Sequence, residues 1–260
     1  MSIVSLFSSG GLSAWPRRRA VRACIVPLVV TAALLAAPSP ASARDLILLI
    51  GNSFSSGLRG DFRRIVRSAG RDAAFSVRAV KGYSLELHLA SGATLDRIQS
   101  KPWNVVVLQE QSDGFTSDRY PFARLLNDEI AATGARTMFM MTWRNRDADL
   151  ADYDSLRGVP DGDEGYVPIA FELGAAIAPA GWAFRESVID DPSVDLWGDD
   201  GHHAGERGRY IAALVLYTAI YAESPVGLWF SPHMTPAEAL RDQQVVESVV
   251  LGNPTDWNIQ

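Results

Sequence analysis

The hydrophobic pattern from residue 45 onward alternates between short runs rich in β-forming residues and longer amphipathic stretches. The short runs predict strands at 46–50, 74–80, 105–109 and 137–142. The amphipathic stretches predict helices at 58–68, 85–98, 121–133, 166–178 and 206–222, with a last helix from 236 to about 251. Strands that alternate with helices are typical of a parallel sheet covered by helices on both faces. The sequence therefore predicts an α/β fold, a three-layer sandwich around a mostly parallel sheet.

Two segments carry signals beyond this alternation. Thr235-Pro236-Ala237-Glu238 combines an N-cap, a proline at the first helical position and a capping glutamate, and Gly252 can end the helix that follows. Residues 143–165 are rich in acidic and poor in aliphatic side chains, which predicts a long loop with a short helix around 148–156. This loop is either a solvated surface excursion or, because it follows a strand's carboxyl end, a lid or rim of a site. It lacks the ligand spacing of an EF-hand, so we expect no calcium there.

The first 43 residues have the pattern of a secretory signal. Four arginines between positions 17 and 22 precede the apolar stretch 25–37, and Ala41-Ser42-Ala43 provides small residues at cleavage-site spacing. A membrane anchor is the alternative, but Pro27 interrupts the stretch, which is shorter than the roughly 20 residues that a spanning helix needs. We therefore expect an exported protein, periplasmic or extracellular, with residues 44–260 as its single mature domain.

Removing the signal changes what the composition allows. The only cysteine, Cys24, lies within it, so the mature chain has no thiol for a disulfide, a zinc site or a nucleophile. Four of the 24 basic residues and none of the 30 acidic ones are lost, which leaves 20 basic against 30 acidic residues and a net charge of -10. Such an acidic protein is a poor candidate for binding nucleic acid or an anionic membrane surface. A neutral or cationic substrate is easier to accommodate.

A serine and an Asp-His pair at opposite ends of the chain suggest nucleophilic chemistry. Ser53 follows the first predicted strand, whose carboxyl end lies at the edge where open α/β sheets bind ligands. A serine hydroxyl needs a base to take its proton and a carboxylate to hold that base. Asp200 lies three residues before His203, and in a tight turn such residues project on the same side. The pair Asp199 and His202 has the same spacing and stays open as the alternative register.

These residues, with others between them, resemble the SGNH hydrolases of the GDSL esterase and lipase group over roughly residues 45–222. Residues 50–55 resemble the first block, with Asn52 where the family commonly has aspartate. Residues 80–82 resemble the second block and end in Gly82, and residues 105–112 fall where the third block belongs. Asp200-Gly201-His202-His203 is similar to the family's last block, and Ala204 stands where the family often has a proline. Gly208 follows His203 at the family's spacing, which favours His203 as the base.

The resemblance implies a flavodoxin-like fold and a catalytic triad of Ser53, His203 and Asp200. It also implies an oxyanion hole formed by the backbone N–H groups of Ser53 and Gly82 and by a side-chain amide. The third block offers Gln111 where the family has asparagine, which marks a divergent subgroup. Glutamine carries the same amide on a longer stem, and Gln109 is a competing candidate for this donor.

The function that we expect from these features is an exported serine esterase that hydrolyses acetyl or short-chain acyl esters, without a metal or cofactor. Export favours a carbohydrate ester, and Trp143, Trp182 and Trp197 could offer stacking faces to a sugar. Core packing is the alternative for these tryptophans, and for Trp182 it has at least equal weight. We expect a small-molecule or glycan ester as the partner, with no nucleic acid and no stable membrane insertion. The alternatives are an inactive glycan-binding protein on the same fold and an acyltransferase that uses the same triad.

Overall fold

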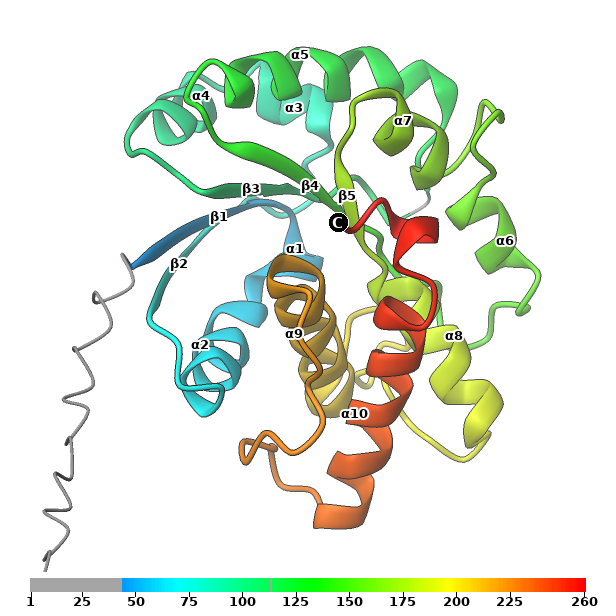
Figure 1. Cartoon of the computed structure of the whole chain (residues 1–260). Helices are drawn as coiled ribbons and strands as arrows, with labels where there is room; N and C mark the ends of the chain where they lie inside the picture. The colour runs from blue at the N-terminus through cyan, green and yellow to red at the C-terminus, as the bar shows by residue number, and fades with distance from the viewer. Residues whose placement is uncertain (1–43, 113) are drawn as a thin grey trace, which may run out of the picture. The chain divides into compact units, whose positions relative to one another are not determined.

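Five parallel strands form the central sheet in the order β2-β1-β3-β4-β5 (Figure 1). The computed structural model describes residues 44–112 and 114–260, so the predicted secretory signal at 1–43 lies outside the described residues. The strands are β1 (Asp45–Gly51), β2 (Ala73–Ala79), β3 (Val105–Leu108), β4 (Arg136–Met140) and β5 (Ala176–Ala178). Every pairing between neighbouring strands is parallel. The predicted α/β fold with a parallel sheet is therefore confirmed.

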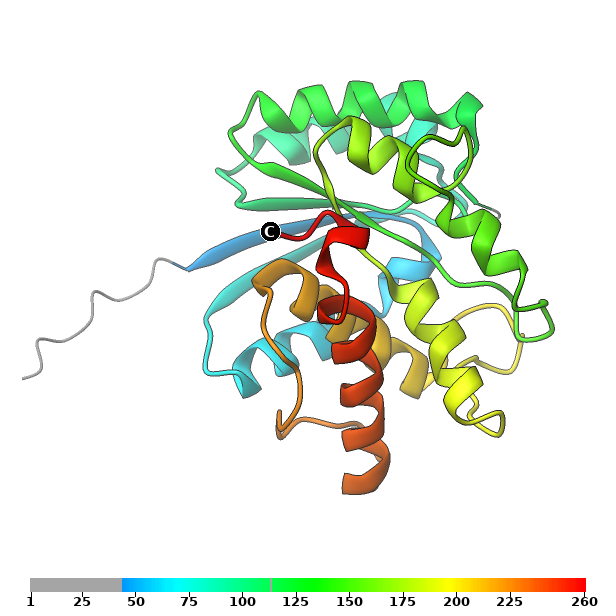
Figure 2. The same cartoon turned by 45° about the vertical axis from the view of Figure 1, so that its right-hand side comes forward.

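Helices cover both faces of the sheet, as a parallel sheet requires (Figures 1 and 2). One face carries α2 (Leu58–Ser68), α8 (Ala180–Asp190), α9 (Glu206–Tyr221) and α10 (Pro236–Leu251). The other face carries α3 (Leu85–Leu89), α4 (Gly92–Gln99), α5 (Tyr120–Ala131) and α7 (Tyr166–Glu172). The remaining short elements are α1 (Ser53–Ser56), α6 (Asp152–Arg157), and the 3₁₀ helices η1 (Ser117–Arg119) and η2 (Pro254–Trp257).

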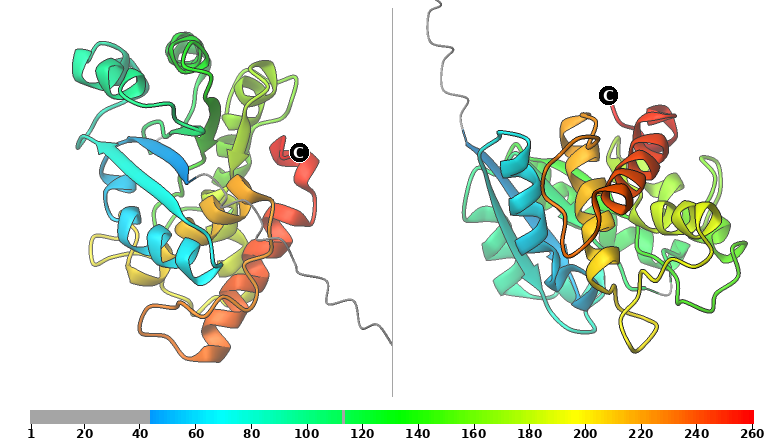
Figure 3. Two further views of the ribbon diagram at one scale, coloured as in Figure 1. Left: turned by 60° about the vertical axis from the view of Figure 1, so that its left-hand side comes forward. Right: turned by 90° about the horizontal axis from the view of Figure 1, so that it is seen from below.

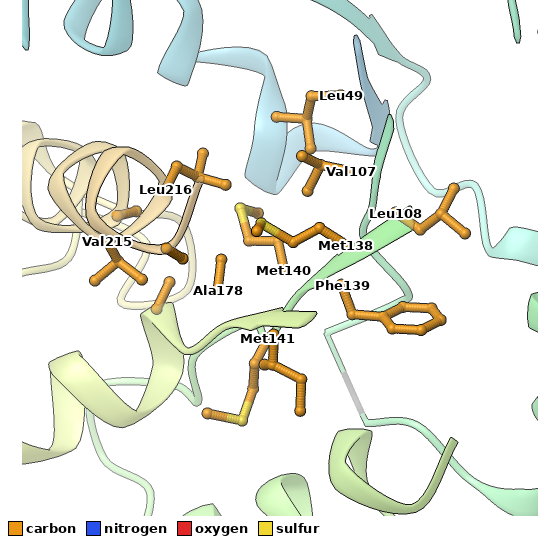
Figure 4. Packing of buried hydrophobic residues seen from close by; sticks show 14 of the residues in the cluster. Leu49, Val107, Leu108, Met138, Phe139, Met140, Met141, Ala178, Val215 and Leu216 are labelled. Atoms are coloured by element: carbon orange, nitrogen blue, oxygen red, sulfur yellow. The ribbon is translucent and has the colours of Figure 1, made fainter. Parts of the chain in front are cut away.

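The core follows the alternation of side chains along the strands. Leu49, Val107 and Met138 are neighbours across β1, β3 and β4, and they face α9 on one side of the sheet (Figure 4). Leu108 and Phe139, one residue further along, point to the opposite side. All five side chains have no exposed surface. Because both of their faces are buried, the central strands β1 and β3 read as nearly continuous apolar runs in the sequence.

Helix α9 is the central helix of its layer. It lies between α2 and α10, and it also packs against α8 and β5 (Figure 3). Every residue from Tyr210 to Ile220 is buried, because neighbours surround the helix on most sides. Such a helix shows little polar-apolar periodicity, and its apolar composition identifies it better than its pattern does.

The structure corrects several predicted boundaries. The predicted helix at 85–98 is two helices, α3 and α4, and the short helix expected around 148–156 is α6, which begins only at Asp152. The helix predicted at 166–178 ends at Glu172, because Gly174 turns the chain with a φ of +62° into the short strand β5. Helix α8 was not predicted. The capping box of Thr235 and Glu238 at the start of α10 is confirmed.

A buried ion pair joins α9 to α10. Arg207 donates to both carboxylate oxygens of Asp242, at 2.7 to 3.2 Å. The carboxyl side chain is 2% exposed and the guanidinium 17%. Burial raises the pKa of Asp242 even though Arg207 acts in the opposite direction. The aspartate thus depends on its arginine partner for its charge.

Replacing Arg207 with alanine is expected to lower the free energy of unfolding by about 3 kcal/mol, since removing one partner of a buried pair leaves the other charge uncompensated. Urea unfolding followed by circular dichroism measures the change. The matched control is Arg241→Ala, whose side chain is 49% exposed beside Asp190 and Asp191 and should cost less than about 1 kcal/mol. An equal loss of unfolding free energy in the two variants would contradict a larger contribution of the buried pair to stability.

Candidate active site

The carboxyl ends of β1, β2 and β3 bring the predicted site residues to one edge of the sheet. Ser53 follows β1 by two residues, Gly82 follows β2 by three, and Gln111 follows β3 by three. The chain leaves β1 toward β2 on one side and returns as β3 on the other. This reversal of strand order is the place where open α/β sheets bind ligands.

Ser53, His203 and Asp200 form a continuous chain of hydrogen bonds. Nε2 of His203 lies 2.9 Å from the Ser53 hydroxyl oxygen, and Nδ1 lies 2.6 Å from Oδ2 of Asp200. The other carboxylate oxygen, Oδ1, accepts from the backbone N–H groups of His202 and His203 at 3.0 Å each. The hydrogen bond from His203, helped by these two N–H groups, holds the pKa of Asp200 well below its usual range. An ionised Asp200 accepts from Nδ1–H and leaves Nε2 to accept the serine proton.

A tight turn produces this i, i+3 contact. Gly201 has a φ of +62°, a conformation that glycine adopts without steric cost, and its N–H donates to Gly198 O at 3.0 Å. The N–H of Gly198 in turn donates to His203 O at 2.8 Å. The turn therefore carries Asp200 and His203 on the same side.

His202 and the remaining histidines are directed elsewhere. Nδ1 of His202 contacts Oδ1 of Asn145 at 2.6 Å, and its ring packs edge-on against Phe54. The structure thus brings His203, and not His202, to Ser53. His88 is buried, contacts Gly51 O through Nε2, and burial lowers its pKa. His233 is 89% exposed beside Glu206, on the surface.

Backbone donors lie on the two loops that flank the nucleophile. Neither the Ser53 N–H nor the Gly82 N–H has an acceptor among the described residues. Gly82 has a φ of +75°, which explains why the loop after β2 carries glycine here. Nε2 of Gln111 donates to Gly82 O at 2.7 Å, so this amide lies against the same loop.

A buried carboxylate ties the loops of Gln111 and Gly82 together. Glu110 has no exposed surface. Its Oε1 accepts from the Gln111 N–H at 2.6 Å, and its Oε2 accepts from the Leu85 N–H at 3.2 Å. Leu85 begins α3, three residues after Gly82. One side chain therefore fixes the end of β3 relative to the loop after β2.

Gln109 is not placed to act as an oxyanion donor. The side chain has no exposed surface, and its Nε2 donates to the neighbouring Glu110 O. Its Oε1 accepts from the Asn52 N–H at 2.9 Å and from the Ser55 hydroxyl at 2.7 Å. The amide thus points into the turn beneath Ser53, and of the two glutamines only Gln111 lies at the Gly82 loop.

Residues 143–165 contribute a rim that is attached to the histidine turn. Trp143 Nε1 donates to His202 O at 3.1 Å, and the Arg146 N–H donates to Gly201 O at 2.9 Å. Arg144 O accepts from Trp197 Nε1 at 2.8 Å. Of the two interpretations offered by the sequence, the contacts favour the rim. Asn145, the partner of His202, lies in this segment, and only its position beyond a strand's carboxyl end could have indicated it.

The three tryptophans proposed as sugar-stacking faces pack inside the protein instead. Trp143 is 1% exposed and stacks on Phe184, with ring centroids 4.6 Å apart. Trp197 is 7% exposed and meets the edge of the same phenylalanine. Trp182 is half-buried, with its ring beside Trp257. The prediction that Trp143 and Trp197 offer stacking faces to a sugar is therefore wrong, because both rings are buried. The half-buried Trp182 packs beside Trp257, in line with the core-packing alternative.

A polar cavity adjoins the histidine turn. Its volume is about 430 Å³, and it is lined by Ser112, Arg144, Asn145, Ala148, Asp152 and His202. The lining offers hydroxyl, guanidinium, amide, carboxylate and imidazole groups but only one apolar side chain. Such a lining suits a ligand that carries hydrogen-bonding groups.

Two kinds of feature are absent from residues 44–112 and 114–260. No three His, Cys, Asp or Glu side chains in this part of the chain are grouped so that they could hold a metal ion. None of the helices described is both long and apolar enough to span a bilayer.

No protein-family model and no curated protein matches the chain. Solved structures do match it. A DUF4886 family protein from Bacteroides uniformis is 18% identical, with a TM-score of 0.64 over 80% of this chain and 95% of that one. A putative SGNH hydrolase from Slackia heliotrinireducens is 26% identical, with a TM-score of 0.52 over 68% of this chain and 99% of that one. TesA is 13% identical, with a TM-score of 0.53 over 68% of this chain and 99% of that one.

These comparisons confirm the resemblance that the sequence motifs indicate. The chain has the fold of the SGNH hydrolases, and the solved structures that it matches include proteins described as esterases, among them an acetyl xylan esterase. This likeness to solved structures shows the fold. The fold alone does not identify the substrate or the roles of individual residues, which have to be argued from the chemistry of the site.

Proposed function

We propose that this protein is an exported serine esterase that hydrolyses acetyl or short-chain acyl esters of carbohydrates. The observation that carries the proposal is the hydrogen-bonded chain from Asp200 through His203 to the Ser53 hydroxyl. A histidine oriented by a carboxylate and in contact with a serine is the arrangement that activates a hydroxyl for attack on an acyl carbon.

The reaction follows from these contacts. Nε2 of His203 takes the Ser53 proton as the oxygen attacks the acyl carbonyl, and the imidazolium then gives that proton to the departing alcohol. Water repeats the sequence on the acyl-serine and releases the acid. Asp200 stays ionised, holds the imidazole tautomer and stabilises the imidazolium. The N–H groups of Ser53 and Gly82 and the amide of Gln111 donate to the developing oxyanion.

The polar cavity supports an alcohol with several hydroxyl groups. Its lining residues can donate to and accept from sugar hydroxyls, and it adjoins His202, one residue from the proposed base. The excess of acidic over basic residues also disfavours an anionic substrate. We therefore propose a neutral acetylated sugar, and the arginines and apolar stretch before residue 44 support its encounter outside the cytoplasm.

Two activities test this proposal. One is acetate release from an acetylated xylo-oligosaccharide, and the other is hydrolysis of p-nitrophenyl esters with acyl chains of two, four, eight and twelve carbons. We expect the acetylated sugar and the two shortest esters to be cleaved and the twelve-carbon ester to be poor. Preference for the long ester would overturn the substrate class. Transfer of acetyl to an added sugar in place of water would indicate the acyltransferase, and binding without turnover the glycan-binding protein.

Gln111→Ala is expected to lower kcat about 10- to 100-fold with little change in KM, because removing one oxyanion donor costs on the order of 100-fold or more and Gln111 shares the task with two backbone groups. Steady-state kinetics on p-nitrophenyl acetate measure it. The control is Gln99→Ala, which removes a surface amide that donates to Glu129. Unchanged kcat in Gln111→Ala would exclude this amide from the oxyanion hole.

A further inference from the structure

Gln109 makes contacts on both sides of the nucleophile in the sequence. Its Oε1 accepts from the N–H of Asn52, the residue before Ser53, and from the hydroxyl of Ser55, two residues after it. The amide has no exposed surface and lies directly after β3, the strand that pairs with β1. A single buried oxygen thus receives two hydrogen bonds from the turn that presents the Ser53 hydroxyl.

The other end of the amide fixes the orientation of that oxygen. Nε2 of Gln109 donates to Glu110 O, so the amide can present only Oε1 to the turn. Asn52 extends the connection, because its Oδ1 accepts from the Phe54 N–H and its Nδ2 donates to Tyr83 O, both at 3.1 Å. Tyr83 follows Gly82 directly. The network therefore links the end of β3, the nucleophile turn and the loop after β2.

Gly51 provides the space for this amide. A Cβ atom at position 51 would lie 2.4 Å from Oε1 of Gln109 and 2.5 Å from the Ser55 hydroxyl. Gly51 is not among the glycines with positive φ, so its backbone conformation does not explain the residue. The close approach of Gln109 does explain it.

We propose that Gln109 is a positioning residue that holds the Ser53 hydroxyl within reach of His203. Its catalytic consequence rests on the proposed function, whereas its effect on the geometry of the turn does not. Without the amide, the Asn52 N–H and the Ser55 hydroxyl lose their shared acceptor and the turn can rotate. A displacement of the nucleophile by about 1 Å is enough to cost on the order of 100-fold in rate.

Two substitutions disturb, from opposite sides, the contact between the Gln109 amide and the turn that carries Ser53. Gln109→Ala removes the acceptor, and Gly51→Ala keeps it but forces it away. Each is expected to lower kcat on p-nitrophenyl acetate about 10- to 100-fold, with KM changed less than about 3-fold. The double variant should lose less than the product of the two single losses, because both act on one contact. Gln99→Ala on the surface is the control and should match the wild type.

Gln109→Glu provides a pH signature. A protonated carboxyl offers one acceptor and one donor, as the amide does, whereas the ionised form cannot donate to Glu110 O. Burial raises the pKa of a carboxyl, so the protonated form is retained at the acid end of the assay range. The ratio of Gln109→Glu to wild-type kcat should therefore fall as the pH rises. A residue that only fills space would give a ratio independent of pH.

Crystal structures of the variants separate this proposal from the proposed function. In Gln109→Ala and Gly51→Ala the distance from the Ser53 hydroxyl to His203 Nε2 should exceed the 2.9 Å of the wild type by about 1 Å or more. An unchanged distance would overturn the positioning role, whether or not the wild type is active. A wild type that hydrolyses no ester, with the turn displaced in both variants, would overturn the esterase proposal and leave the positioning role standing.

Discussion

Replacing Ser53 with alanine is expected to lower kcat for p-nitrophenyl acetate by roughly 10⁴- to 10⁶-fold, to the background rate. The reason is that the Ser53 hydroxyl, 2.9 Å from Nε2 of His203, is the proposed nucleophile. Alanine leaves the helix-forming backbone of α1 unchanged, so the fold and the thermal stability should be retained. Initial rates of p-nitrophenol release, corrected for spontaneous hydrolysis, give the measurement.

Ser56→Ala is the matched control for this substitution. Ser56 lies in the same short helix, is exposed, and donates its hydroxyl to Ser53 O. It should retain kcat within about 3-fold, because a surface hydrogen bond contributes little. A Ser53→Ala variant as active as Ser56→Ala would refute nucleophilic catalysis by Ser53.

His203→Ala is the second substitution with a large expected effect, a loss of about 10⁴-fold or more in kcat. Without the imidazole, Ser53 has no base and the leaving alcohol has no proton donor. His202→Ala is the matched control, because it removes the same imidazole side chain from the preceding residue. The His202 Nδ1 contacts Asn145 and its ring packs against Phe54, so His202→Ala should change KM more than kcat.

The pair of histidine variants decides the register that the sequence leaves open. Steady-state kinetics on the same ester, with circular dichroism to verify folding, compare them directly. A loss of kcat in His202→Ala alone would assign the base to His202 and would require the turn at Gly201 to rearrange on substrate binding.

The sheet and the positions of the site residues could be predicted from the sequence because the signals are strong and local. Four of the five strands lie where short runs rich in β-forming residues predict them. Ser53, Gly82 and Gln111 follow three of these strands within three residues, and the carboxyl ends of parallel strands meet at one edge. The Asp200 and His203 spacing required only a tight turn to bring the side chains together.

The elements that the sequence did not predict lack such local signals. Strand β5 has the sequence Ala-Ile-Ala, which is equally compatible with a helix, and its pairing with β4 selects the strand. Helix α8 has weak periodicity, because three helices, α6, α9 and α10, pack against it. Tertiary contacts overrode local preference in both cases.

The role of Gln109 shows a further limit of sequence patterns. An amide near a strand end can point outward to a substrate or inward to a turn, and the sequence is the same in both cases. Residues two apart share one face of a regular strand, but β3 ends at Leu108, and Gln109 and Gln111 lie beyond it and take these different directions. Trp143 and Trp197 were misjudged for a related reason, since their burial depends on Phe184 of α8, which is distant from both in the sequence.

Covalent trapping of the acyl-enzyme tests most directly whether Ser53 is the nucleophile. The wild type is mixed with p-nitrophenyl butyrate, quenched in acid and analysed by peptide mass spectrometry, beside Ser53→Ala and Ser56→Ala. We expect one butyryl group on Ser53 in the wild type and in Ser56→Ala, and none in Ser53→Ala. Ester hydrolysis with the butyryl group on another residue, or with no adduct and no loss of activity in Ser53→Ala, would contradict this role of Ser53.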